Sequence, residues 1–292
     1  MLALTVALAV VVGLALGLLG GGGSILLVPL LVYVAGMPTA QAITTSLVVI
    51  GVTAGVGVAG HARARRVRWR TGFVFGLAGV VGAVAGGLIG GHLPGQLLMV
   101  AFAVLMVATA LAMLRGRRPG APTAAPERPP LGRLLGIGAA VGLVTGLLGA
   151  GGGFLIVPAL TLLAGLPMTA AVGTSLLVIT LNSAAGLAGH LTGVPIDWPL
   201  AAAVTAAAVL GSVVGARLLG RIPADALRRG FGWFVLAMGA LVLALQAPAG
   251  WHLPALLGAA TATAGVGACW AFVPRCPLRH TGGRGAGMAR AA

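Results

Sequence analysis

The stretch Gly17-Leu-Leu-Gly-Gly-Gly-Gly-Ser-Ile-Leu-Leu-Val-Pro29 recurs later in the chain as Gly146-Leu-Leu-Gly-Ala-Gly-Gly-Gly-Phe-Leu-Ile-Val-Pro158, an offset of 129 residues. The same offset aligns further pairs: Gly36 with Gly165, Pro38 with Pro167, Thr45-Ser46 with Thr174-Ser175, Gly60-His61 with Gly189-His190, and Trp69 with Trp198. Chance similarity between apolar segments would not keep these residue types in step without a gap. The pattern therefore indicates an internal duplication.

The composition is that of a membrane protein. Of 292 residues, 59% are hydrophobic and 7% are charged, and the mean hydropathy is +1.10. A soluble domain carries about 25% charged residues, so this chain lacks the polar surface to face water on all sides. Its apolar stretches approach the roughly 20 residues that span a bilayer. We therefore expect an all-α, multi-pass integral membrane protein in the cell membrane, with lipid as its surroundings.

The duplicated unit predicts about five apolar helices in each copy. The expected helices are 2–19, 24–36, 40–60, 71–91 and 95–114 in the first copy, and 134–148, 153–165, 169–189, 199–219 and 226–246 in the second. The corresponding organisation is a first membrane repeat at 1–114, a basic Pro/Ala-rich linker at 115–133, a second membrane repeat at 134–246, a candidate additional transmembrane helix at 251–273, and a basic disordered tail at 274–292.

Charge predicts how the copies are oriented. The second helix of each copy spans only about 20 Å at 1.5 Å per residue, so the first two helices read as a glycine-broken hairpin with both ends on one face. Three further spans then make the crossing number odd, which inverts the second copy. All 18 basic residues are Arg, and they lie in four segments: 62–70, 115–133, 217–229 and the tail. This arrangement places the first three on one side of the membrane, and the tail joins them if 251–273 crosses once more. Four crossings per copy in parallel would place 217–229 on the other side. Because the Arg residues lie in short segments between apolar helices, they indicate which loops face the cytoplasm and argue against nucleic-acid binding.

The glycine clusters are the first candidate functional site. Glycine permits unusual backbone angles and a close approach of a ligand, and irregular backbone in a membrane belongs beside protein or a wet cavity. A helix that starts after each cluster would offer free N–H groups to an anion. The alternative is that these glycines only permit tight helix packing. The candidate substrate-binding residues are Gly20, Gly21, Gly22, Gly23 and Ser24 in the first copy, and Gly149, Gly151, Gly152, Gly153 and Phe154 in the second.

Hydroxyl and amide side chains follow each cluster on the next helix. Such groups can line a solute site or form hydrogen bonds between helices, and both interpretations stand. Asn182 is the most costly of them to bury. The candidate substrate-binding residues of this kind are Thr45, Ser46, Thr174, Ser175 and Asn182.

His61 and His190 occupy equivalent positions near helix ends. A histidine there is either an interfacial or capping residue or a titratable gate, because its charge changes near neutral pH. The three acidic residues, Glu127, Asp197 and Asp225, all fall in loops or at helix ends. That placement argues against a proton relay through buried carboxylates.

An enzyme is not indicated, because no catalytic triad, zinc spacing or phosphate loop is recognisable. Cys269 and Cys276 stand without a cluster of further ligands, so no metal and no cofactor is expected.

The order of these motifs resembles the sulfite exporter TauE/SafE family. The resemblance rests on the doubled Gly-x-x-Gly-x-Gly-Gly run ending in Pro, the Thr-Ser pairs and the segment from His190 to Trp198, and it covers about residues 1–246. It implies a permease of the bacterial cytoplasmic membrane for small, often sulfur-containing anions. In the first copy an Arg-rich loop follows His61, where the family pattern has a Gly and Asp turn.

These observations together favour a transporter for a small anion, such as sulfite or a sulfonate, that works by alternating access. The alternative is a non-transporting membrane scaffold or assembly subunit, in which the same helices serve packing alone. Solute, direction of transport and coupling ion stay open at this point, and a homo-oligomer is compatible with the sequence.

Overall fold

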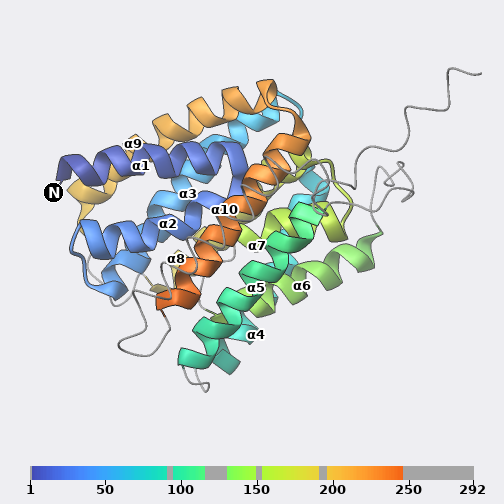
Figure 1. The fold of residues 1–292 in the computed structure, drawn as a ribbon, viewed down its shortest axis with the longest axis horizontal. Coiled ribbons are helices and arrows are strands. Elements are labelled where there is room, and N and C mark those ends of the chain that lie inside the picture. The colour runs from blue at the N-terminus through green and yellow to red at the C-terminus, as the bar shows by residue number, and fades with distance from the viewer. Residues whose placement is uncertain (1, 91–94, 116–129, 149–152, 191–195, 246–292) are drawn as a thin grey trace, which may run out of the picture. The chain divides into compact units, whose positions relative to one another are not determined.

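The structure is a computed structural model that describes residues 2–90, 95–115, 130–148, 153–190 and 196–245 (Figure 1). Within these ranges the chain forms helices joined by short turns, and no β-strand. The elements are α1 (Leu2–Leu19), the 3₁₀ segment η1 (Gly20–Gly23), α2 (Ser24–Pro29), the π-helical segment η2 (Leu30–Val34), α3 (Thr39–Arg63), α4 (Trp69–Gly90), α5 (Gly95–Arg115), α6 (Leu131–Leu148), α7 (Gly153–Pro158), the π-helical segment η3 (Ala159–Leu163), α8 (Met168–His190), α9 (Trp198–Leu218), the 3₁₀ segment η4 (Leu219–Arg221) and α10 (Ala224–Leu245).

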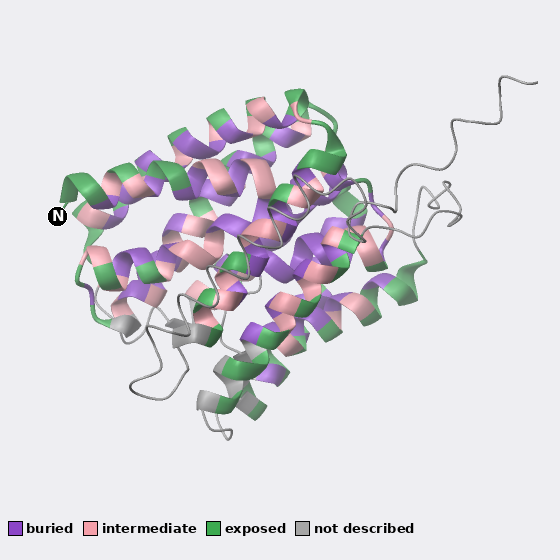
Figure 2. Cartoon of the chain, viewed as in Figure 1, coloured by how far each residue is buried: buried purple, intermediate pink, exposed green. Residues whose placement is uncertain are grey.

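Six helical stretches in the described part of the chain are long and apolar enough to cross a membrane. They are Leu2–Val34, Gln41–Arg63, Trp69–Gly86, Met168–Leu187, Trp198–Arg221 and Ala224–Leu243. Their outward faces carry large apolar side chains, such as Leu77, Val81 and Val84 on α4, and Figure 2 shows exposed residues alternating with buried ones along each helix. Such faces suit lipid tails. The predicted all-α membrane fold is confirmed.

The boundaries of the helices in the second copy follow those of the first at the offset read from the sequence. Helix α1 corresponds to α6, and α2 with η2 corresponds to α7 with η3. Each π-helical segment follows a proline, Pro29 or Pro158, whose missing N–H disturbs the regular helical hydrogen bonding. Residues 116–129 and 246–292, with the predicted linker, additional span and tail, lie largely or wholly outside the described residues.

Each short helix ends at a glycine in the left-handed region. Gly36 has φ +72° and Gly165 has φ +77°. In both copies the next N–H turns back onto the helix: Met37 N–H donates to Leu31 O at 3.0 Å, and Leu166 N–H donates to Leu160 O at 2.9 Å. A left-handed glycine of this kind closes a helix end and redirects the chain. Each bond reaches one residue further back than in the Schellman motif, and it follows a π-helical turn.

The first copy opens with a helical hairpin rather than one long span. Leu2–Val34 is 33 residues long, about 50 Å if it were straight, which exceeds the hydrocarbon core of about 30 Å. Gly20 has φ +70° and reverses the chain. A Cβ added at Gly23 would lie 2.5 Å from Val12 O and 2.7 Å from Leu16 N, so α2 returns beside α1 (Figure 1).

The first helix of each copy packs against the fourth helix of the other. Between α1 and α9, Gly13 lies against Ala208 and Gly17 against Ser212. Helices α6 and α4 meet in the same way at Gly142. Because the residue numbers rise together across both contacts, the two helices of each pair run parallel. Backbones approach this closely only where no side chain intervenes, which is the role of small residues in membrane helices.

The third helices of the two copies, α3 and α8, pack antiparallel. Gly51 lies beside Ser183, whereas Gly57 lies beside Leu176, so the residue numbers run in opposite directions. Equivalent helices of the two copies therefore point opposite ways. This geometry supports the predicted inverted arrangement, and the orientation in the membrane stays a prediction.

The chain divides into two compact units that do not coincide with the copies. One unit comprises residues 1–98 and 126–228, and the other comprises 99–125 and 229–292. In the second unit α5 packs against α10: Gly232 lies beside Leu114 and Gly239 beside Met106. The fifth helices of the two copies are thus antiparallel as well. The candidate site lies entirely within the first unit.

Candidate functional site

The glycine break of the first copy lies inside the protein. Gly20 to Gly23 form a 3₁₀ turn, and all four residues are buried. The hydroxyl of Ser24 donates a 2.6 Å hydrogen bond to Gly21 O, which satisfies one carbonyl of the turn. Gly20 packs against Ser175 of α8: a Cβ added at Gly20 would overlap the Ser175 hydroxyl. The sequence therefore bends at a point where another helix leaves room only for glycine.

The break of the first copy touches the start of the short helix in the second. A Cβ added at Gly21 would coincide with the Gly153 carbonyl, and one added at Gly153 would meet the Ser24 hydroxyl. Phe154, the next residue of α7, is fully buried. The structure thus brings together candidate residues from both clusters. Gly149, Gly151 and Gly152 lie outside the described residues.

The predicted serines are satisfied locally. Ser46 donates to Ile43 O at 2.7 Å, and Ser175 donates to Val172 O at 2.8 Å. These two bonds occupy matching positions in the copies. Each hydroxyl keeps its acceptor lone pairs, and that of Ser175 sits beside Gly20.

The predicted threonines, by contrast, differ between the copies. Thr174 accepts a 3.0 Å hydrogen bond from the Arg68 N–H. Thr45, at the matching position, is buried, and its hydroxyl has no partner in the described part of the chain. A buried hydroxyl without a partner costs free energy, so Thr45 is a site where a ligand or a change of conformation would be favourable.

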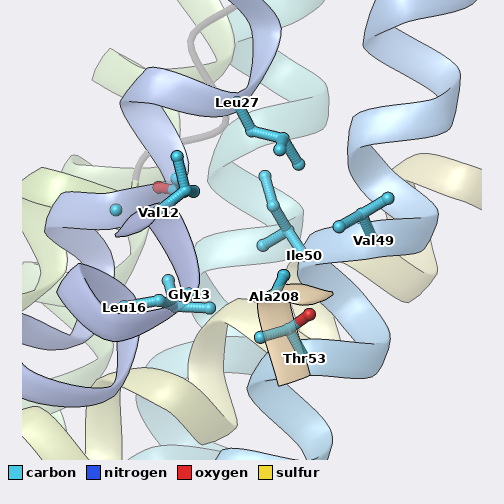
Figure 3. A pocket seen from close by; sticks show the side chains of 10 residues that line it. Val12, Gly13, Leu16, Leu27, Val49, Ile50, Thr53 and Ala208 are labelled. Carbon is cyan, nitrogen blue, oxygen red and sulfur yellow. The ribbon is translucent and has the colours of Figure 1, made fainter. Parts of the chain in front are cut away.

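A small pocket borders the first break (Figure 3). Its volume is about 10 Å³, room for about one water molecule. Figure 3 shows Thr53 and Ile50 of α3 among the side chains that surround it, with Val12 of α1 and Leu27 of α2. The lining residues are Val12, Gly13, Leu16, Gly23, Ser24, Leu27, Val49, Ile50, Thr53 and Ala208.

Thr53 and Asn182 occupy matching positions in the two copies. Both present a buried side-chain oxygen that has no hydrogen-bond partner among the described residues. Asn182 lies beside Gly79 of α4, where a Cβ would be 3.9 Å from the amide oxygen. Gly79 in turn matches Ala208, which lines the pocket beside Thr53. The two copies thus place a polar group without a partner at equivalent points, a hydroxyl in one and an amide in the other.

His61 is buried inside α3, two residues before the helix ends. Its Nε2 lies 3.3 Å from Gly17 O, a carbonyl in the last turn of α1, which the helix itself leaves without a donor. With Nε2–H as the donor, the imidazole ties the end of α1 to α3. Its Nδ1 has no partner among the described residues. His190 is the last residue of α8, and its side chain lies outside the described residues.

Arg66 is the residue at this site that sequence reasoning missed. The Arg cluster was interpreted mainly as a topology signal, yet Arg66 is half-buried while its neighbours Arg65 and Arg68 are exposed. Its Nη1 donates to Ala216 O of α9 at 3.4 Å. A comparison of the two copies could have pointed to Arg66, because the second copy has Pro195 at the matching position.

No cluster of three or more His, Cys, Asp or Glu side chains that could hold a metal ion occurs in the described residues. Asp197 acts as the N-cap of α9, where it accepts a 3.1 Å hydrogen bond from Leu200 N–H. Asp225 pairs with Arg228 at 3.4 Å. Among the described residues, the polar groups around the first break are therefore backbone groups, hydroxyls, the His61 imidazole and the Arg66 guanidinium.

These features define the class of protein: a multi-pass membrane protein with a buried helix break in its first copy, of the kind that carries small solutes. The chain belongs to the sulfite exporter TauE/SafE family, whose model matches residues 5–242. The match confirms the resemblance noted from the sequence and makes this protein a membrane transporter.

Relatives from bacteria and archaea agree with this assignment. A protein of Xylella fastidiosa called a probable membrane transporter protein is 37% identical over 238 residues, which is 80% of this chain and 91% of the relative. The probable membrane transporter protein YunE of Bacillus subtilis is 29% identical over 73% of this chain and 86% of its own length. A probable membrane transporter protein of Methanocaldococcus jannaschii is 27% identical over 63% and 72%. No solved structure matches the chain.

Proposed function

We propose that this transporter carries a small sulfur-containing oxyanion, such as sulfite or a sulfonate, by alternating access at the glycine breaks. The single observation that carries the proposal is the contact of Gly21 with Gly153. In carriers built from inverted repeats, broken helices from the two repeats meet near the middle of the membrane and form the substrate site.

The polar groups at the first break favour an anion over a cation. A cation would need free carbonyl oxygens or carboxylates. Two carbonyls here are already engaged, Gly17 O by His61 and Gly21 O by Ser24. Of the acidic residues that the structure describes, Asp197 caps α9 and Asp225 lies in the first turn of α10, so neither lies in a helix interior. The chain has a formal net charge of +15, which attracts anions to its surface.

Alternating access is supported by the directions of the helices. Helices α1, α3 and α9 run one way: Gly57 of α3 lies beside Ser212 of α9 and Gly60 beside Ala216, so the residue numbers rise together. Helices α4, α6 and α8 run the other way: Gly72 of α4 lies beside Leu177 of α8 and Gly76 beside Leu181. Two such sets, each drawn from both copies, provide elements that can rock against one another about a central site. The sulfur chemistry of the solute rests on the family description and on the anion-compatible groups.

The test is uptake of labelled sulfite, thiosulfate, sulfoacetate and chloride into vesicles that contain the purified protein. We expect sulfite or sulfoacetate to accumulate and chloride to accumulate far less. Gly20→Ala, which places a side chain at φ +70° against Ser175, should reduce uptake at least tenfold. Gly55→Ala, whose Cβ would sit at an ordinary 3.7 Å from Thr180, should transport normally. Equal uptake by Gly20→Ala and wild type would refute the site, and uptake of none of the sulfur anions would refute the substrate class.

A further inference from the structure

The loop between α3 and α4 contacts helices of the second copy beside the glycine turn. Arg65 has φ +55°, and the N–H of Arg66 donates to His61 O at 2.9 Å. This turn folds the loop back on the end of α3. Its position matters because His61 also holds the end of α1 at Gly17, next to the break.

Arg66 reaches from this loop to the end of α9. Its Nη1 donates to Ala216 O at 3.4 Å, in the last turn of a helix, where unsatisfied carbonyls carry partial negative charge. Gly220 makes room for the guanidinium: a Cβ there would lie 2.7 Å from Arg66 Nη2. The side chain therefore spans the gap between the α3–α4 loop of the first copy and η4 of the second.

A second tie joins the same loop to α8. The Arg68 N–H donates to the Thr174 hydroxyl at 3.0 Å, and a Cβ at Gly173 would lie 2.7 Å from Arg66 O. Ser175, the next residue along from Thr174, packs against Gly20 of the break. The loop thus rests on the part of α8 that touches the glycine turn. We call the loop with its two ties, Arg66 to Ala216 and Arg68 to Thr174, the arginine clamp.

The second copy lacks the residues for a matching clamp. Pro195 replaces Arg66, so no guanidinium is available at that position. Thr45, the counterpart of Thr174, has a buried hydroxyl that finds no partner in the described part of the chain. The clamp therefore occurs at only one end of the transporter, the end that carries the Arg-rich loop.

The bond that holds the clamp is one that an oxyanion can replace. Arg66 makes one long hydrogen bond to a neutral carbonyl. The described carboxylates lie elsewhere, Asp197 at the start of α9 and Asp225 beside Arg228. A guanidinium prefers a charged oxyanion, which it binds with two parallel hydrogen bonds. An oxyanion arriving at this end therefore competes for Arg66 and frees the end of α9.

We propose that Arg66 is the positioning residue that links arrival of an oxyanion at the Arg-rich end to opening of the glycine site. The inference rests on the proposed function for the nature of the solute. The clamp holds the site closed at this end in the absence of anion, and exchange of the Ala216 carbonyl for the oxyanion releases it.

The test is hydrogen exchange of the backbone amides of residues 20–24 and 172–176, followed by mass spectrometry on the detergent-solubilised protein. In wild type, 10 mM sodium sulfite should speed exchange about tenfold, and sodium chloride at equal ionic strength should not. Arg66→Gln should exchange about tenfold faster without any anion and should not respond to sulfite. Arg66→Lys should respond only weakly to sulfite, because an ammonium lacks the two-pronged geometry. Arg70→Gln removes one exposed charge of the same cluster and neither of the two ties, so it should behave as wild type.

The outcomes separate this inference from the proposed function. Suppose that, without anion, the amides of Arg66→Gln exchange at the wild-type rate, while sulfite uptake into vesicles is intact. That result would overturn the clamp and leave the transport proposal standing. Sulfite-accelerated exchange in Arg66→Gln would also overturn it. Fast exchange in Arg66→Gln combined with no uptake of any sulfur anion by wild type would support the clamp and refute the proposed substrate.

Discussion

The backbone of Gly21, in the first copy, lies directly against that of Gly153 in the second, so closely that a Cβ on Gly21 would take the place of the Gly153 carbonyl. The contact joins two segments that the duplication made equivalent in sequence and that the fold places face to face. Both residues are buried. The predictions below follow from this contact and from the side chains around it.

Gly21→Ala should destabilise the protein, because the added methyl group meets backbone that cannot move aside. Overpacking of this kind costs about 1–3 kcal/mol. The thermal midpoint in detergent should fall clearly, and uptake of sulfite into vesicles should fall with it. Gly55→Ala is the matched control: its Cβ would lie at ordinary contact distances from the Thr180 side chain, 3.7 Å from the methyl carbon and 3.9 Å from the hydroxyl. An unchanged midpoint for Gly21→Ala would contradict the packing of the two breaks.

His61→Leu should be more damaging than His61→Gln. Leucine leaves Gly17 O without the donor that His61 supplies, and an unsatisfied buried carbonyl costs about 1–3 kcal/mol. Glutamine keeps an N–H donor of similar reach. Thermal midpoints of the two variants in detergent measure the difference. If both variants behave alike, the hydrogen bond to Gly17 does not hold the end of α1.

Thr53→Val should show whether the Thr53 hydroxyl contributes to protein stability or to solute binding. Valine has the shape of threonine and removes a buried hydroxyl that has no partner in the described residues, so stability should hold or rise by about 1 kcal/mol. If the hydroxyl contacts the solute, uptake of sulfite should nevertheless fall severalfold. Thr205→Val is the control, since that hydroxyl already donates to Ala201 O at 2.6 Å on a different helix. Normal uptake by Thr53→Val would remove this residue from the site.

Equivalent positions of the two copies should face opposite sides of the membrane. Pro38 and Pro167 are both exposed and precede the antiparallel helices α3 and α8. With Cys269 and Cys276 replaced by serine, Pro38→Cys and Pro167→Cys should react with a membrane-impermeant maleimide from opposite sides. Arg65→Cys and Arg221→Cys should react from the same side as Pro167→Cys, because Arg66 contacts the end of α9. Labelling of both proline positions from one side would exclude inverted repeats.

Much of the helical architecture was readable from local sequence. Predicted helices such as 2–19 and 95–114 agree with α1 (Leu2–Leu19) and α5 (Gly95–Arg115), because apolar runs bounded by Gly, Pro and Arg leave little choice in a membrane. The third helix was predicted to end at Gly60, and α3 instead continues to Arg63. The added residues include His61, whose imidazole contacts Gly17 O of α1. The prediction that glycines break the hairpin agrees with the left-handed Gly20 in the first copy, and the second break lies outside the described residues.

The amino-acid sequence by itself determined the duplication, the membrane class, the hairpin breaks and the excess of positive charge, because each depends on residue types at fixed spacing along the chain. Only the tertiary structure decided that Gly21 meets Gly153, that His61 serves Gly17 O, and that Arg66 alone of its cluster turns inward to Ala216. The physical reason is that helix spacing within a copy is local, whereas these contacts join segments from different helices or different copies. Their partners are selected by the close approach of small residues, for which periodicity along one chain gives no signal.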